Sequence, residues 1–178
     1  MPRIPPVSAS ADATVTAVLD DMKARKGKAS NAMATLAQSP AAFNGYLALS
    51  KALMRGRLTG RQREILALAI AQTNACQYCL SVHTQTGKTA GLSPTDILNA
   101  RAGKSDNVLD NAIAAFAVKV VQQKGLVDDA DLVAAREAGI DDGLMVEIVA
   151  NVSLNTLTNY NNRLADTEID FPVVQVEL

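Results

Sequence analysis

The chain has 178 residues, a length that fits one domain with its own hydrophobic core. Hydrophobic residues make up 48% and charged residues 20% of the sequence, and the net charge is −1 with no long basic run, so we expect neither nucleic acid nor a membrane surface as a partner. The longest purely apolar run, residues 112–118, is far too short to span a bilayer. The first residues contain no apolar segment typical of signal peptides, so we expect a cytoplasmic protein.

Hydrophobic periodicity is helical along almost the whole chain and predicts an all-α fold of about seven or eight helices in a single domain. Three prolines among the first six residues predict an extended arm over residues 1–11. We expect the helical domain over 12–166, with its core at about 40–130, and a tail over 167–178. The predicted helices cover 12–37, with an interruption at Gly27, and then 40–54, 60–73, 75–90, 94–102, 107–124, 128–138 and 142–165.

Capping boxes stand at both ends of the third of these segments, residues 60–73. Thr59 and Gln62 open the helix at 60–73, which is apolar on nearly all sides and is therefore predicted to be central and buried. Asn74 and Gln77 match the same pattern and predict Asn74 as the N-cap of the next helix. Cys76 would then be at about the second helical position, one turn before Cys79.

Two features near the C-terminus also lead to expectations. Residues 171–178 alternate like a strand but have no partner strand in the sequence, so we expect them to pack as an arm, and a neighbouring subunit is one candidate surface. Asparagine is a poor helix former, and we expect the dense asparagines near the end of the last helix to reflect capping and fraying, with hydrogen bonding between helices or subunits as the alternative. These residues are Asn155, Asn159, Asn161 and Asn162.

The two cysteines and the single histidine of the chain all fall within eight residues, as Cys76, Cys79 and His83. On a helix, residues three and four apart share a face, so the two thiols and the imidazole point the same way. Thiolates near a helix N-terminus are stabilised by the helix dipole, and the imidazole can take or relay the thiol proton. Glu64, on the preceding buried helix, is the best candidate to orient that imidazole and accept its proton.

Other readings of this constellation differ in their structural context. A thioredoxin motif needs a strand just before the CxxC helix, whereas a capped helix precedes Cys76 here, so we reject it. A structural or binding protein could hold a metal with Cys76, Cys79 and His83, and Glu64 as a fourth ligand, but structural zinc usually draws on two separated knuckles. The two cysteines could also be inert small residues of the core.

The spacing Glu64-x11-Cys76-x2-Cys79-x3-His83 resembles the signature of AhpD-like alkylhydroperoxidases, which belong to the carboxymuconolactone decarboxylase superfamily. The lead-in at 58–64 and the run from Asn159 to Asp166 are also similar to that family, and the resemblance covers roughly residues 40–166. It implies an all-helical fold and a homo-oligomer, either a trimer or a hexamer.

The resemblance also implies a reaction, the reduction of organic hydroperoxides in an antioxidant role. Cys79 would be the peroxidatic thiolate, Cys76 would condense with its sulfenic acid to a disulfide, and Glu64 and His83 would form a proton relay. A dithiol donor, either a lipoyl domain or a thioredoxin-like protein, would reduce the disulfide. We expect no bound cofactor and no metal for this cycle.

One position departs from the family pattern. Some redox members carry a second histidine just before the second cysteine, where this chain has Tyr78. We expect Tyr78 to pack or to form a wall of the substrate pocket, because a phenol is a poor proton carrier near neutral pH. A lactone enzyme of the decarboxylase type is the remaining alternative, and it would not need the cysteine pair.

Overall fold

The computed structural model describes residues 1–7 and 12–178, and within them the chain is entirely helical, with no strand. This confirms the all-α fold, with nine helices in the described residues rather than seven or eight. The helices are α1 (Ala13–Lys26), α2 (Asn31–Leu36), α3 (Pro40–Leu53), α4 (Gly60–Thr73), α5 (Gln77–Thr89), α6 (Pro94–Arg101), α7 (Val108–Gln122), α8 (Asp129–Glu137) and α9 (Asp142–Ala165).

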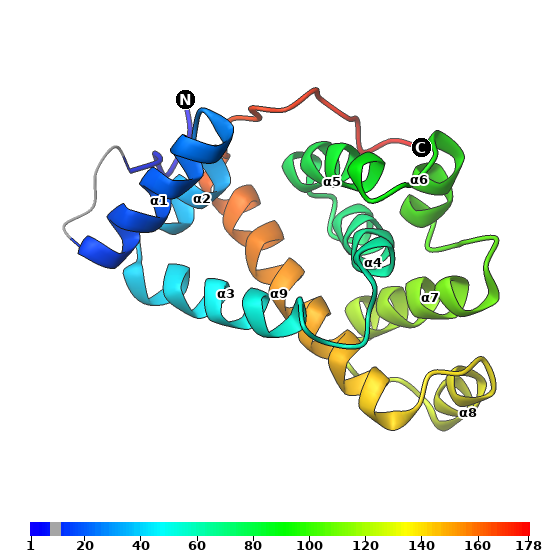
Figure 1. Cartoon of the computed structure of the whole chain (residues 1–178). Helices are drawn as coiled ribbons and strands as arrows, with labels where there is room; N and C mark the ends of the chain where they lie inside the picture. The colour runs from blue at the N-terminus through cyan, green and yellow to red at the C-terminus, as the bar shows by residue number, and fades with distance from the viewer. Residues whose placement is uncertain (8–11) are drawn as a thin grey trace.

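Helix α4 is the centre of the fold and packs against α5, α6, α7 and α9 (Figure 1). Every residue from Ile65 to Ala71 is buried. Because this stretch is apolar on all sides, it is stable only when other helices surround it, as the sequence predicted. Two layers of the core meet on α4: Leu66 and Ile70 face α7 and α9, whereas Ile65 and Leu68 pack with the CxxC residues.

Helix α9 is the longest element, with 24 residues that span about 36 Å. It crosses the molecule from α8 to α2 and contacts α3, α4, α5 and α7 on the way (Figure 1). Leu144, Ile148 and Val152 bury its first half in the core beside α7. Its second half lies against the start of α5 and therefore helps to shape the surroundings of the cysteines.

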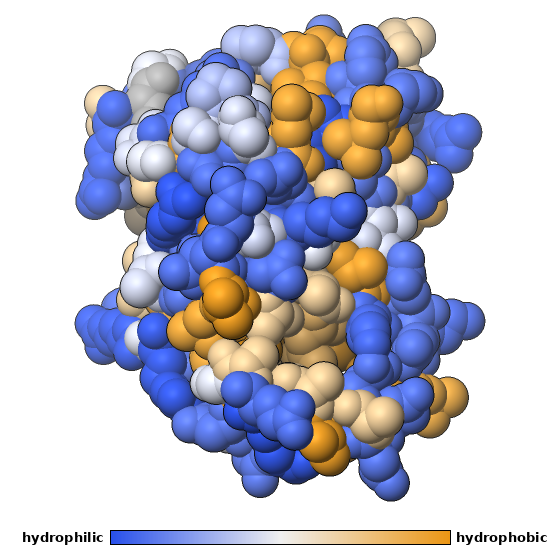
Figure 2. All heavy atoms as spheres, turned by 90° about the vertical axis from the view of Figure 1, so that its right-hand side faces the viewer, coloured by the Kyte–Doolittle hydropathy of each residue, from blue (hydrophilic) through white to orange (hydrophobic). Residues whose placement is uncertain are grey.

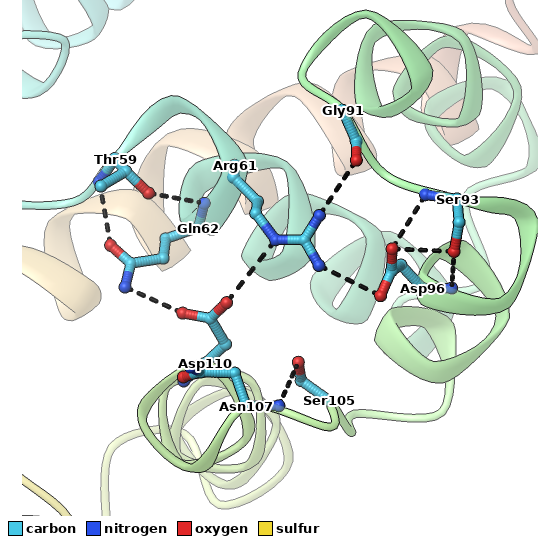
Figure 3. A network of polar contacts seen from close by, with 9 residues as sticks. All are labelled: Thr59, Arg61, Gln62, Gly91, Ser93, Asp96, Ser105, Asn107 and Asp110. Atoms are coloured by element: carbon cyan, nitrogen blue, oxygen red, sulfur yellow. Dashed lines mark hydrogen bonds and ion pairs between the residues drawn. The ribbon is translucent and has the colours of Figure 1, made fainter.

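A polar network around Arg61 ties the start of α4 to the starts of α6 and α7 (Figure 3). Its guanidinium lies 3.0 Å from Asp96 and 3.8 Å from Asp110 and donates to the carbonyl of Gly91. Gln62 completes the predicted capping box with Thr59 and also donates to Asp110. The network fixes the N-terminal end of α4, from which Glu64 projects.

The predicted helix over 12–37 is two helices in the structure. Gly27 adopts a left-handed conformation with φ 77° and ends α1, because a residue without a Cβ tolerates this turn. Ser30 then caps α2. The described part of the N-terminal arm is extended, and the amide of Arg3 donates to the carbonyl of Ala165, whereas residues 8–11 of the predicted arm lie outside the described residues.

The C-terminal tail packs on its own chain, across α5 and α6, and forms no strand in the described residues (Figure 1). The buried guanidinium of Arg101 donates to the carbonyls of Gln175, Val176 and Glu177. The amide of Val174 donates to Ser81 on α5. The strand-like alternation therefore reflects an arm with one side against the CxxC core of its own chain, as the partial burial of Ile169, Phe171, Val174 and Val176 requires.

The face that carries α6, α7 and α8 is largely hydrophilic, with apolar side chains gathered both in its upper part and in its lower half (Figure 2). A hollow of about 120 Å³ lies between α7 and α8 and has mainly alanine walls. Lys119 and Asp131 form an ion pair at its edge. None of the helices in the described residues is long and apolar enough to cross a membrane.

Candidate active site at the CxxC turn

The two cysteines lie at the turn between α4 and α5, and this turn differs from the predicted one. Asn74 is the C-cap of α4 rather than the N-cap of α5. Ala75 follows with φ 49°, a left-handed conformation that costs an L-residue about 1–2 kcal/mol. Cys76 is itself the N-cap, and its sulfur accepts the backbone N–H of Cys79 at 3.3 Å.

Cys76 and Cys79 are joined in a disulfide, with their Cα atoms 5.2 Å apart. Both residues are almost completely buried, at 0% and 2% exposure. The ring is therefore the oxidised form of a dithiol that sits at a helix N-terminus, where partial positive charge stabilises thiolates.

Glu64 and His83 meet across α4 and α5, with the imidazole Nδ1 2.9 Å from the Glu64 carboxylate. Thr86 donates to the same carboxylate oxygen at 2.6 Å. Burial favours the neutral acid, but the hydrogen bonds from His83 and Thr86 and the His83 charge outweigh it, so the pKa of Glu64 lies below its ordinary value. Glu64 is therefore an ionised group that orients His83 and leaves Nε2 for exchange with a substrate or thiol.

The Glu64–His83 pair opens onto a groove of about 650 Å³ between α3, α4, α5 and α9. Its walls combine apolar side chains with hydroxyls and amides, among them Tyr46, Leu53, Asn155 and Thr158. Neither Cys76 nor Cys79 is among the described residues that line this groove. Cys79 is one turn before His83 on the same face of α5, and His83 lines the groove.

The sequence interpretation missed Tyr46, which lines the groove on α3. Burial and, secondarily, the charge of Glu64 raise the pKa of the Tyr46 phenol, so it stays protonated. Tyr46, Ser50 and Leu53 follow one another at helical spacing of four and three residues, and that shared face was the available signal.

A smaller hollow of about 240 Å³ lies on the other side of the turn, and Cys76 forms part of its wall. Tyr78 belongs to this hollow, with Cys76, and not to the Glu64–His83 groove, so the structure separates it from Glu64 and His83. Its hydroxyl donates to Asp170 at 2.7 Å and accepts the amide of Ala32 at 3.2 Å, and its ring packs edge-on against Phe171. Burial raises the pKa of Tyr78, so this hydroxyl links the tail and α2 rather than carrying protons.

Asn155, Asn159 and Asn162 are buried and Asn161 is partly buried within an intact helix, so the expected fraying is wrong. The alternative of interhelical hydrogen bonding is correct for two of the four. Asn159 accepts from the side chain of Asn74 at 3.0 Å. Asn162 points its amide nitrogen at the sulfur of Cys79, 3.5 Å away. Two of the asparagines therefore face the CxxC turn.

The geometry gives no support to the metal-holding alternative. Across residues 1–7 and 12–178, no three His, Cys, Asp or Glu side chains converge as metal ligands would. The carboxylate of Glu64 is instead occupied by His83 and Thr86.

An all-helical fold with a CxxC turn beside a Glu–His pair defines a class of thiol-bearing helical proteins, and comparisons with known proteins agree. The model of the carboxymuconolactone decarboxylase family matches residues 40–123, which run from α3 to α7 and include the Glu64, Cys76, Cys79 and His83 positions. A comparison with curated protein sequences gives no match.

Solved structures share the fold over nearly the whole chain. An uncharacterized peroxidase-related protein with an AhpD core from Ralstonia eutropha JMP134 aligns with a TM-score of 0.82 and 24% identity, over 94% of this chain and 93% of that one. An uncharacterized peroxidase-related protein from Silicibacter sp. TM1040 aligns with a TM-score of 0.78 and 17% identity, over 93% and 91%. The debrominase Bmp8 aligns with a TM-score of 0.77 and 18% identity, over 94% and 91%. The chain is thus similar to the carboxymuconolactone decarboxylase family over residues 40–123 and shares the fold of AhpD-like proteins over nearly its whole length.

Proposed function

We propose that this protein is a thiol-dependent peroxidase that reduces organic hydroperoxides through a Cys76–Cys79 dithiol/disulfide cycle. The observation that carries the proposal is the juxtaposition of an ionised, hydrogen-bonded Glu64–His83 pair with a CxxC pair one helical turn away. A proton acceptor, a nucleophile and a resolving thiol are the three groups that such a cycle needs.

In the first step, His83 removes the thiol proton of Cys79, and Glu64 stabilises the resulting imidazolium. The Cys79 thiolate attacks the terminal oxygen of the hydroperoxide, the O–O bond breaks, and the leaving alkoxide takes a proton from His83 to become an alcohol. Cys79 is thereby oxidised to a sulfenic acid. The groove beside His83 is the proposed route of the hydroperoxide.

In the second step, the Cys76 thiol attacks the sulfur of the sulfenic acid, forming the disulfide and releasing water. The described structure corresponds to this product. A dithiol reductant, a lipoyl domain or a thioredoxin-like protein, then attacks Cys76, because this sulfur borders the smaller hollow. Attack there expels Cys79 as a thiolate and, after exchange, leaves the reductant oxidised and both cysteines reduced.

The proposed setting is a homo-oligomer in the cytoplasm, where thiol reductants are abundant. An apolar stripe on α9 supports the oligomer, because contiguous exposed apolar side chains on a helix are typical of contact surfaces. The stripe follows helical spacing and consists of Val146, Val149, Leu157, Tyr160 and Leu164.

The test is to add a small excess of cumene hydroperoxide to the fully reduced protein and to count free thiols over time. We expect rapid loss of both thiols per chain in the wild type and no peroxide-driven loss in Cys79→Ser. Cys76→Ser should consume about one peroxide equivalent and then stop, because its sulfenic acid has no resolving thiol. If thiols persist in the wild type and remain titratable after denaturation, the peroxidase proposal is wrong.

Reductive dehalogenation is a second candidate for the same site. The groove is larger than a small hydroperoxide requires, and a structural neighbour is a debrominase described in complex with 2,3,4-tribromopyrrole. The Cys79 thiolate would attack the bromine as it attacks a peroxide oxygen: the C–Br bond breaks and the ring carbon takes a proton from His83. The Cys76 thiol would then attack the sulfur of the S–Br group, which forms the disulfide and releases bromide. Bromide release from a brominated pyrrole, absent in Cys79→Ser, would favour this reading, whereas lactone turnover that survives loss of both cysteines would favour a decarboxylase-type enzyme.

A further inference from the structure

One face of α9 carries a stripe of buried asparagines, which is unusual because amides are rarely buried and are poor helix formers. The exposures of Asn151, Asn155, Asn159 and Asn162 are 2%, 9%, 0% and 5%. The stripe divides into two pairs. Asn151 and Asn155 donate to carbonyls of their own helix and line the groove, whereas Asn159 and Asn162 lie at the CxxC turn.

Asn162 is the member that reaches a reacting atom. Its Nδ2 lies 3.5 Å from the Cys79 sulfur, within the distance of a hydrogen bond to sulfur. Its Oδ1 is buried and has no hydrogen-bond partner among the described residues. A buried amide whose hydrogen bonds are incompletely satisfied destabilises the fold, so a role in the chemistry would explain its presence.

The disulfide form of Cys79 does not compensate for burying this amide, because a disulfide sulfur is a weak hydrogen-bond acceptor. A thiolate is a strong one, and a hydrogen bond to an ionised acceptor is about twice as strong as a neutral one. We infer that Asn162 is a catalytic residue whose amide N–H stabilises the thiolate of Cys79. This inference deepens the proposed function, because the same thiolate is the nucleophile toward the peroxide and the leaving group when the disulfide is reduced.

The two sulfurs are served by different kinds of donor. The Cys76 sulfur accepts the backbone N–H of Cys79, which every side-chain substitution retains. The Cys79 sulfur depends on the side chain of Asn162, from another helix. A change at position 162 therefore acts selectively on Cys79.

Neighbouring contacts hold Asn162 at the turn. Asn159 accepts from the side chain of Asn74 at 3.0 Å, and Arg163 donates to the carbonyl of Asn74 at 2.8 Å. A residue before position 162 and a residue after it thus bind Asn74, the C-cap of α4 two residues before Cys76. Asn159 and Arg163 are positioning residues, since they act on the sulfur only through the placement of α9.

The test measures thiolate formation directly, in the Cys76→Ser background, where Cys79 is the sole thiol of the chain. Thiolate absorbance at 240 nm is followed from about pH 4 to 9, and the Cys76→Ser, Cys79→Ser double variant is subtracted to remove tyrosine absorbance. Asn162→Ala should raise the apparent pKa of Cys79 by about one unit, a tenfold smaller thiolate fraction below that pKa.

Asn162→Asp is nearly isosteric, and the direction in which it shifts the pKa of Cys79 tests the inference. A carboxylate next to the sulfur repels the thiolate, so the pKa should rise further than in Asn162→Ala. The matched control is Asn161→Ala, which removes the same side chain one position earlier on α9, where the residue is only partly buried and lies about 100° around the helix from Asn162. This control should titrate like the Cys76→Ser parent.

Circular dichroism selects the variants that fold, and the isosteric Asn162→Asp keeps the test decisive if Asn162→Ala unfolds. Equal Cys79 pKa values in the parent, Asn162→Asp and Asn161→Ala would overturn the inference, as would a fall in the pKa. The measurement uses no peroxide, so a failure of the peroxidase proposal and a failure of the Asn162 inference give different results.

Discussion

The two sides of the CxxC turn differ in chemistry, although they are separated by only one helix. The groove side holds the ionisable pair, Glu64 and His83, in a large space with mixed walls. On the hollow side, Cys76 and Asn162 line the smaller hollow, and the hydroxyl of Tyr78 donates to Asp170 of the tail. In the proposed cycle, proton transfer thus belongs to one side and sulfur stabilisation to the other, and Cys79 connects them.

The largest effect should follow from removing the proton acceptor on the groove side. We expect His83→Ala to slow peroxide-driven thiol loss by about 100-fold near neutral pH, because general-base catalysis by a positioned imidazole contributes at least that much. Stopped-flow measurement of thiol oxidation tests this. Gln85→Ala, a neighbouring change on α5 outside the groove lining, is the control and should react like wild type. An unchanged oxidation rate in His83→Ala would show that proton transfer does not depend on the groove side, and the proposed difference between the two sides would be wrong.

The next effect concerns stability and the hollow side. Tyr78→Phe deletes the hydroxyl that joins Asp170 to the amide of Ala32, and leaving such buried groups without a partner costs about 1–3 kcal/mol. Urea unfolding should show this loss, with peroxide-driven thiol oxidation largely retained. Tyr160→Phe, at an exposed position, should leave stability unchanged. Slower thiol oxidation at unchanged stability would instead show that Tyr78 takes part in the reaction, as Glu64 and His83 are proposed to do.

A smaller effect is expected from loosening the tail that covers the hollow side. Arg101→Gln removes the guanidinium that binds three successive tail carbonyls, with an expected loss of about 1 kcal/mol in the unfolding free energy. Hydrogen exchange should accelerate over residues 174–178 and not in α3. The exposed Arg55→Gln is the matched control. Uniform acceleration across the whole chain would mean that Arg101 supports the fold generally and not the tail.

The smallest effect is a pH dependence on the groove side. The pKa of Glu64 lies below its ordinary value of 4.5, so its carboxylate stabilises the fold above that pH, and this contribution disappears as the pH falls through the folded-state pKa. Unfolding midpoints measured from pH 7 down to pH 3 should therefore converge between wild type and Glu64→Gln. Parallel curves over that range would show that ionised Glu64 adds nothing to stability.

The helices and the Glu64–His83 contact could be predicted because local signals govern them. The apolar period gave the helices, including the buried α4, and proline and serine marked the start of α3 and α6. Glu64 lies on α4 and His83 on α5, and only a tight turn separates the two helices. Because a short turn places consecutive helices side by side and antiparallel, it brings these two side chains together.

The asparagine and tail contacts depend on tertiary structure and lay beyond a reading of local pattern. Asn162 reaches Cys79 across 83 positions, and Arg101 reaches the tail across more than 70. The Asn74 error has a local cause: Asn74 and Gln77 matched a capping box, but the chain needed a left-handed residue at Ala75 to turn from α4 into α5. Because of that turn, the N-cap of α5 is Cys76, and its sulfur accepts a backbone N–H as a serine hydroxyl does at other N-caps.

The distribution of aromatic residues has a spectroscopic consequence. The chain contains three tyrosines and no tryptophan, so its ultraviolet fluorescence comes from tyrosine. Tyr46 lines the groove, Tyr78 lies beside the cysteine pair, and Tyr160 is exposed on the apolar stripe of α9. Replacing two of the three tyrosines by phenylalanine would therefore leave one optical reporter, for substrate entry, redox state or subunit association according to the tyrosine kept. A tryptophan introduced at any of the three positions would be the sole one in the protein.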